Sequence, residues 1–272
     1  SAASDVYKRQ SDMDGTLLND RKELPGDFFE VFDELERRGI KFTVASGRSF
    51  DAVAHLFPEE YRTRLDFICD NGANVIHEGK QVSVTPLDRP TFEQLIRACE
   101  DIGGLRVLVC AGRGTYHLTA DAEFSAEIAK YYKNHIPCDD LLSVDDVIYK
   151  LAVCDMKGTQ QHAKPAIDAI FGDRLNVQVS GPIWMDVMGA GVSKGSALRA
   201  LGKHLGVSAE DTMAFGDFYN DADMLKYAGW SFAMENGNPD IKRMTRFLAR
   251  SNNENGVLRA IRQYALQEDS IK

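Results

Sequence analysis

Short apolar strands alternate with amphipathic helices at both ends of the chain, and this alternation limits the possible folds more than any other feature. Residues 25–38 carry apolar side chains at helical spacing, and Gly39 follows them. Residues 40–45 come next and are rich in β-branched and aromatic side chains, which predicts a strand. Strand and helix in alternation predict the α/β class, a doubly wound (Rossmann-like) parallel sheet with helices on both faces.

The same alternation returns near the C-terminus. A helical pattern at 194–205 ends at Gly206, a strand is predicted at 212–215 and another at 231–234, and a last helix is predicted at 256–266. We therefore expect residues 11–83 and 188–272 to form one discontinuous core domain.

The order changes between these two parts, where predicted strands follow one another in pairs. Adjacent strands suit antiparallel hairpins, so residues 84–187 are predicted to form an inserted α+β domain. Its predicted helices are 91–102, 122–134 and 160–171, and its predicted strands are 105–110, 115–119, 149–154, 175–180 and 184–187.

Composition and hydropathy exclude a disordered, a fibrous and a membrane-spanning protein. The 272 residues are 44% hydrophobic and 27% charged, as in globular proteins, and no stretch approaches the roughly 18 apolar residues that cross a bilayer. A net charge of −9 disfavours nucleic acid and anionic membranes as partners. The five cysteines contain no Cys-x-x-Cys pair, so neither zinc nor a disulfide framework is indicated. The predicted location is cytoplasmic.

Acidic and hydroxyl side chains follow three of the predicted strands. Asp12 and Asp14 lie near the start, Ser46 follows strand 40–45, and Asp217 and Asp221 follow strand 212–215. Ligands of doubly wound sheets bind at the carboxyl ends of the strands, so these groups are expected to converge. Four carboxylates at one edge repel one another unless a cation lies among them, and hard oxygen ligands favour Mg²⁺.

These residue types meet the needs of phosphoryl transfer. Asp12 can be both the nucleophile that attacks phosphorus and a metal ligand, and Asp14 can protonate the leaving oxygen and then deprotonate water. Ser46 offers a hydroxyl to a phosphate oxygen, and Lys194 supplies fixed positive charge. Each motif alone also has a simpler interpretation, a capped turn or a solvated lysine, and only their convergence favours catalysis.

Four segments together resemble one family. Residues 12–18 read Asp-Met-Asp-Gly-Thr-Leu-Leu, residues 45–48 Ala-Ser-Gly-Arg, residues 191–195 Gly-Val-Ser-Lys-Gly, and residues 216–221 Gly-Asp-Phe-Tyr-Asn-Asp. In this order and over nearly the whole chain, they resemble the Cof-type phosphatases of the haloacid dehalogenase superfamily. The inserted domain stands where that family has its large cap, which closes over the phosphate site and selects the leaving group.

The resemblance implies a Mg²⁺-dependent phosphatase that hydrolyses small phosphorylated metabolites, sugar phosphates first, through an aspartyl-phosphate. It implies a nucleophile at Asp12, an acid/base at Asp14 whose backbone carbonyl also contacts the metal, and metal ligands at Asp217 and Asp221. Ser46 and Lys194 complete the catalytic set. The predicted substrate contacts are Thr16, Gly47, Asn220 and Asn236, and a turn-forming role stays open for Asn236.

The first ten residues depart from the family, which enters its first motif through a buried apolar strand. Here residues 8–10 are Lys, Arg and Gln, and burying them in a central strand is costly. Residues 1–10 also resemble a translated sequencing adapter, so we expect them to be a non-native leader.

Two alternative functions stay open at this point, a phosphosugar mutase and a non-catalytic protein that binds phosphorylated metabolites. The intact Asp14 argues against the second, because binding does not need that carboxylate. The predicted partner is a small-molecule phosphate ester, and the sequence predicts neither the physiological substrate nor the oligomeric state.

Overall fold

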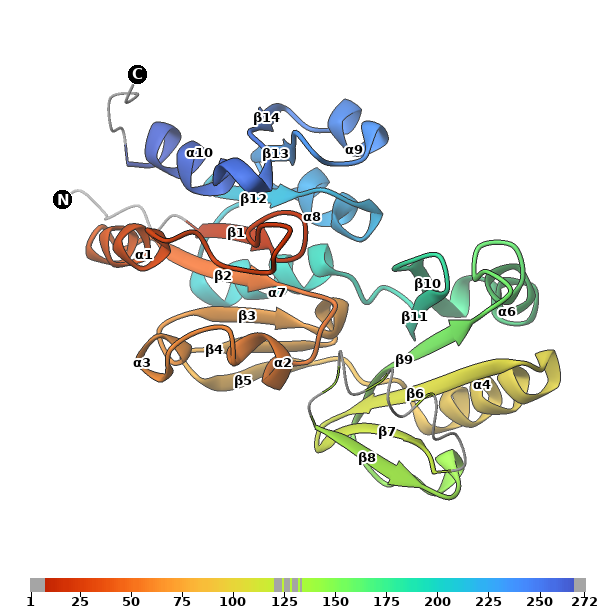
Figure 1. Cartoon of the computed structure of the whole chain (residues 1–272). Helices are drawn as coiled ribbons and strands as arrows, with labels where there is room; N and C mark the ends of the chain where they lie inside the picture. Colours follow the sequence, from red (N-terminus) through yellow and green to blue (C-terminus); the bar gives the residue numbers. More distant parts are fainter. Residues whose placement is uncertain (1–7, 120–123, 125–127, 129–131, 133, 267–272) are drawn as a thin grey trace. The chain divides into compact units, whose positions relative to one another are not determined.

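The computed structural model describes residues 8–119, 124, 128, 132 and 134–266, with the backbone alone for residues 8–10 (Figure 1). Packing divides the chain into two compact units, which we call the core unit and the inserted unit. The core unit comprises the described residues within 1–47, 56–83 and 193–272, and the inserted unit comprises those within 48–55 and 84–192. The predicted boundaries at 84 and 187 stay a prediction.

An eight-stranded sheet forms the core unit, in the order β14-β13-β12-β1-β2-β3-β4-β5. The strands from β14 to β3 pair in parallel, and β4 is antiparallel to β3. Their bounds are β1 Lys8–Asp12, β2 Lys41–Ala45, β3 Asp66–Cys69, β4 Asn74–His77, β5 Lys80–Val84, β12 Thr212–Gly216, β13 Trp230–Met234 and β14 Phe247–Ala249.

Strand β1 marks the point where the strand order reverses. The chain runs outward from β1 through β2 and β3 on one side, and it returns to β12, β13 and β14 on the other. The backbone of Asp12 pairs in register with Ala45, and Ser11 pairs with Phe215 of β12. Doubly wound sheets bind their ligands at such a reversal, beyond the carboxyl ends of the strands.

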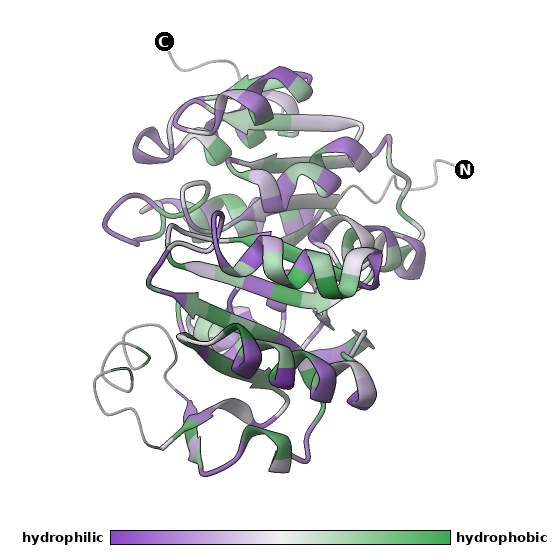
Figure 2. Cartoon of the chain, turned by 90° about the vertical axis from the view of Figure 1, so that its right-hand side faces the viewer, coloured by the Kyte–Doolittle hydropathy of each residue, from purple (hydrophilic) through white to green (hydrophobic). Residues whose placement is uncertain are grey.

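Helices cover both faces of this sheet. On one face Ile68 and Ala214 pack in a cluster with Leu198 of α7, and on the other the ring of Phe42 lies 5.4 Å from that of Phe28 in α1. The helices of the core unit are α1 Phe28–Arg37, α3 Glu59–Arg62, α7 Lys194–Leu205, α8 Ala222–Tyr227, α9 Pro239–Met244 and α10 Gly256–Tyr264. Figure 2 shows hydrophobic and hydrophilic residues along the helices, as in amphipathic helices. The predicted doubly wound α/β fold is confirmed.

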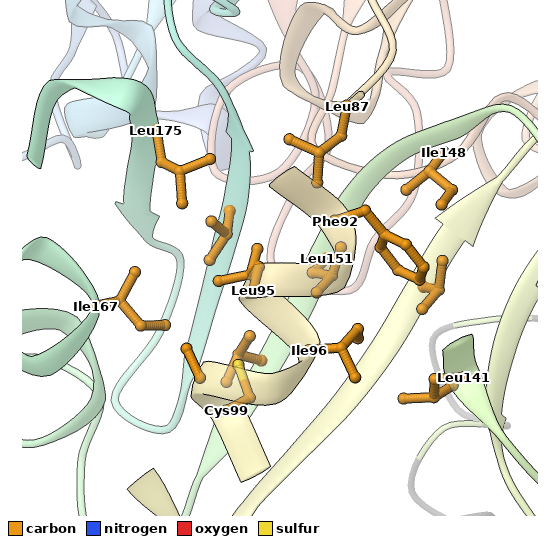
Figure 3. Close-up of a cluster of buried hydrophobic side chains, with 14 of the residues drawn as sticks. Leu87, Phe92, Leu95, Ile96, Cys99, Leu141, Ile148, Leu151, Ile167 and Leu175 are labelled. Atoms are coloured by element: carbon orange, nitrogen blue, oxygen red, sulfur yellow. The ribbon is translucent and has the colours of Figure 1, made fainter. Parts of the chain in front are cut away.

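The inserted unit has its own six-stranded sheet, in the order β10-β11-β9-β6-β7-β8. All pairs are antiparallel except β7 with β8. Helices α4 and α6 pack on this sheet around a buried cluster that includes Phe92, Leu151 and Ile167 (Figure 3). The bounds are α2 Phe50–Ala54, α4 Arg89–Ile102, β6 Leu105–Ala111, β7 Gly114–Leu118, β8 His135–Cys138, β9 Ile148–Asp155, α6 Ala163–Phe171, β10 Leu175–Val179 and β11 Trp184–Gly189.

Most predicted elements are present within a few residues of their expected ends, with exceptions. The short elements α3, α9, β4, β5, β8 and β14 were not predicted. The predicted helix 122–134 lies for the most part outside the described residues. Residues 8–10, the end of the predicted leader, run as backbone of β1 between β2 and β12. Their non-native origin stays a prediction. Within the described parts of the chain, no helix is long and apolar enough to cross a membrane.

Candidate active site

Asp12 is the last residue of β1, and the chain turns sharply after it. The side chain is buried, and its backbone carbonyl accepts the N–H of Leu17 at 3.2 Å. Gly15 has a φ of +76°, and a Cβ on it would lie 2.5 Å from Oδ2 of Asp217. A side chain at position 15 would therefore be strained and would displace Asp217, so this turn needs glycine.

Lys194 is the first residue of α7 and is completely buried. Its Nζ donates to Oδ1 of Asp12 and, at 2.8 Å, to Oδ1 of Asp221. The helix begins in a capping box, in which Ser193 accepts the N–H of Ser196 at 3.0 Å. The capped helix start fixes the backbone from which Lys194 reaches the two carboxylates.

The segment after β12 fixes the two remaining acids. Oδ2 of Asp221 accepts the backbone N–H of Asp217 at 2.9 Å and of Phe218 at 3.2 Å. Thr16 Oγ1 donates to Oδ1 of Asp217 at 3.1 Å. Gly216 leaves no room for a Cβ, which would lie 2.5 Å from Cβ of Asp221. The carboxylates of Asp217 and Asp221 are thus held in place by backbone N–H groups and by the short side chain of Thr16.

Burial and like charges raise the pKa values of Asp12 and Asp217. Burial, followed by the negative charge of Asp221, raises the pKa of Asp12 well above its usual range, although Lys194 opposes the shift. The same two causes raise the pKa of Asp217 to about 6. Burial alone would lower the pKa of Lys194, but the charges of Asp12 and Asp221 outweigh it and raise that pKa. The cluster therefore carries more negative charge than one ammonium can balance.

The arrangement fits a cation. Ligand atoms of Asp12, Asp217 and Asp221 lie within 4.8 Å of one another, and no other such group of His, Cys, Asp or Glu occurs among the residues that the structure describes. Carboxylate oxygens are hard ligands of the kind that a small divalent cation prefers. The carboxylate of Asp14 lies outside this group and pairs with Lys22 at 2.9 Å. The predicted metal contact through the backbone carbonyl of Asp14 stays a prediction.

Ser46 and Gly47 follow β2 and lie beside Asn71, which follows β3. The N–H of Asn71 donates to the carbonyl of Ser46 at 3.1 Å, and a Cβ on Gly47 would lie 3.1 Å from Oδ1 of Asn71. Asn220 Nδ2 donates to the same Oδ1 at 3.5 Å. The structure thus brings Ser46, Gly47 and Asn220 together through Asn71.

Asn236 supports the turn that follows Asp12. Its Nδ2 donates to the carbonyl of Gly15 at 2.7 Å, and its Oδ1 accepts the N–H of Asn252 at 3.0 Å. Both polar atoms of the amide thus bind backbone groups of the turn and of a distant loop. The predicted contact of Asn236 with substrate stays a prediction.

Comparison with known proteins gives the family. Residues 10–261 match the model of the haloacid dehalogenase-like hydrolase family. The chain belongs to that family. The prediction of a hydrolase of this superfamily is confirmed, and so is the prediction that the chain is an enzyme.

Relatives of this hydrolase match along most of their lengths. The 5-amino-6-(5-phospho-D-ribitylamino)uracil phosphatase of Escherichia coli (strain K12) is 29% identical over 252 residues, which are 92% of this chain and 93% of the relative. The HMP-PP phosphatase of Klebsiella pneumoniae (strain 342) is 27% identical over 232 residues, with 85% of each chain covered. A crystal structure from Streptococcus mutans UA159 has a TM-score of 0.88 at 26% identity, covering 97% of this hydrolase and 100% of that chain.

The side chains of Asn71 and Lys22 touch predicted site residues, but both residues are absent from the predicted set. Asn71 has a φ of +54°, and the sequence signal for it was the Asp-Asn-Gly that follows strand β3. Lys22 has a φ of +64° and carries no motif, because its contact with Asp14 depends on the turn between them.

Proposed function

We propose that this hydrolase is a Mg²⁺-dependent phosphatase that acts on small phosphorylated metabolites through an aspartyl-phosphate at Asp12. One observation carries the proposal: the buried ammonium of Lys194 joins Asp12 to a cluster of two further carboxylates. Asp14, two residues on, keeps its carboxylate outside that cluster. A nucleophile and a separate acid/base are what a two-step phosphoryl transfer requires.

In the first step, a carboxylate oxygen of Asp12 attacks phosphorus and the ester P–O bond breaks. Asp14 gives its proton to the leaving oxygen, so the alcohol departs neutral. In the second step, a water oxygen attacks phosphorus, the bond to Asp12 breaks, and the water proton passes to Asp14. The enzyme then releases inorganic phosphate with both aspartates restored.

The surrounding charges support these steps. Lys194 balances negative charge on Asp12 and on the phosphoryl oxygens, and the N–H groups that bind Asp221 keep that acid in place. Asp12, Asp217 and Asp221 would hold the Mg²⁺ ion. When bound, Mg²⁺ supplies positive charge to the phosphoryl group and neutralises the excess carboxylates.

Two observations support the substrate class. The named relatives act on a phospho-ribityl compound and on HMP-PP, both small phosphorylated molecules. Asp14 suits an alcohol leaving group, which needs a proton to depart. We place sugar and sugar-alcohol phosphates first, and we assign the choice among them to a cap at residues 84–187.

A panel of phosphorylated metabolites tests this function through phosphate release with and without Mg²⁺. We expect release from sugar or sugar-alcohol phosphates that depends on Mg²⁺ and is absent from Asp12→Asn. Formation of an isomeric phosphate ester without free phosphate would favour a mutase. Tight binding without any turnover would favour a non-catalytic binding protein.

A further inference from the structure

Lys22 lies in an exposed turn with a backbone conformation that lysine rarely adopts. Its φ is +64°, in the left-handed region. Oδ1 of Asn19 accepts the N–H groups of Arg21 at 2.9 Å and Glu23 at 3.0 Å, and the carbonyl of Asn19 accepts the N–H of Lys22 at 2.9 Å. The turn is therefore held in this conformation by its own hydrogen bonds.

The side chain of Lys22 reaches back to the predicted acid/base. Its Nζ donates to Oδ1 of Asp14 at 2.9 Å, with 57% of the Lys22 side chain and 36% of the Asp14 side chain exposed. Ion pairs this exposed contribute little to stability. Stability gained from the pair therefore does not account for a left-handed lysine, whereas strained backbone is often kept at functional sites.

We propose that Lys22 is a positioning residue for Asp14. By binding one oxygen of the carboxyl group, it restricts the rotation of that group and keeps the second oxygen directed at the leaving oxygen of the substrate. The isolated bridge between Asp14 and Leu18 fixes the backbone on the other side. This inference rests on the proposed function and adds a residue that the family motifs do not contain.

The consequence is a dependence on the leaving group. An alkyl phosphate expels a strongly basic alkoxide, which needs the proton of Asp14, whereas 4-nitrophenolate departs readily without one. The ratio kcat/KM includes the steps up to departure of the leaving group. A misplaced Asp14 should therefore lower kcat/KM for the alkyl ester more than for the aryl ester.

The test compares Lys22→Met with Arg21→Met, a matched control on the same exposed turn whose side chain pairs with Glu23. Glycerol phosphate and 4-nitrophenyl phosphate are the two substrates. General acid–base catalysis contributes about 10²–10⁴-fold, so losing part of it should lower kcat/KM of Lys22→Met for glycerol phosphate by about tenfold. We expect a decrease of less than about threefold for the aryl ester, and no change in Arg21→Met.

A second variant separates positioning from structural support. Lys22→Gly removes the ammonium but suits a positive φ, so its urea midpoint should equal or exceed that of the unaltered protein. We expect this variant to lose the same alkyl-ester activity as Lys22→Met while it stays stable. Equal losses on both esters, or no loss on either, would overturn the role of Lys22 and leave the proposed function standing. If the unaltered protein releases phosphate from neither ester and from no member of the metabolite panel, the proposed function is wrong and this inference falls with it.

Discussion

Replacing Lys194 with methionine removes the only positive charge that the structure shows bonded to Asp12 among the described residues. The Nζ lies 2.8 Å from Oδ1 of Asp221, where two unit charges attract by about 6 kcal/mol at an effective dielectric constant of about 20. Desolvation of the ammonium offsets part of this attraction. Removing one partner of a buried ion pair costs about 3–5 kcal/mol of stability. We expect the free energy of unfolding of Lys194→Met to fall by about this amount.

The pH dependence of this loss follows from the pKa shifts. The charge of Lys194 lowers the pKa values of Asp12 and Asp217, so without it these two values rise further above their unfolded values. A group with a raised pKa binds more protons in the folded state, so its destabilising effect is absent below the unfolded pKa and grows as pH rises through the folded pKa. The folded pKa of Asp217 is about 6 and that of Asp12 is raised well above its usual range, so the stability gap between the two proteins should widen as pH rises from 5.5 to 8.

Urea unfolding of both metal-free proteins at the two pH values measures this gap. Lys203→Met is the matched control, because Lys203 lies exposed on the same helix. We expect it to change the free energy of unfolding by less than about 0.5 kcal/mol. A Lys194→Met variant as stable as the control, or a gap that narrows as pH rises, would refute the buried ion-pair arrangement.

Two further predictions concern the turn after Asp12 and the cation. Gly15→Ala should lose most activity, because the new Cβ would displace Asp217. Gly39→Ala is the control: Gly39 has a similar φ and no atom within 4 Å of a new Cβ, so this variant should lose only about 1 kcal/mol of stability. Equal kcat/KM values in the two variants would contradict the steric argument. Mg²⁺ at 100 times its Kd should raise the free energy of unfolding by about 2.7 kcal/mol near pH 7.5. The gain should shrink as pH falls through about 6, because burial raises the pKa of Asp217 to about 6 and the proton must leave before the metal binds. A thermal shift that is equal at pH 5 and pH 7.5 would contradict this.

The convergence of the site could be predicted because it depends on strand direction alone. Asp12 ends one strand of the parallel sheet and Ser46 and Asp217 each follow another, and the carboxyl ends of parallel strands share one edge. Lys194 could be placed because it opens a helix that the periodicity of residues 194–205 indicates. These relations hold whatever the conformations of the intervening loops.

Contacts made by loops could not be predicted. The pairing of Lys22 with Asp14 depends on a left-handed lysine, which no local pattern indicates. The bonds of Asn236 connect two segments that are remote in sequence. Strand β14 has only three residues, too few for a period of two to be detected. The first strand has a polar sequence at residues 8–10, but pairing of its backbone with β2 and β12 does not depend on side-chain pattern.

The central claim, that Asp12 carries the phosphoryl group, has a direct measurement. The enzyme is mixed with Mg²⁺ and a phosphate ester that it hydrolyses, and the reaction is quenched in acid within one turnover. The protein is then digested and analysed by mass spectrometry. We predict a phosphoryl group on Asp12 that hydroxylamine removes, with no label in Asp12→Asn. Any one of three results would contradict the account: turnover with no phosphoryl group on Asp12, a phosphoryl group on another residue instead, or activity that remains in Asp12→Asn.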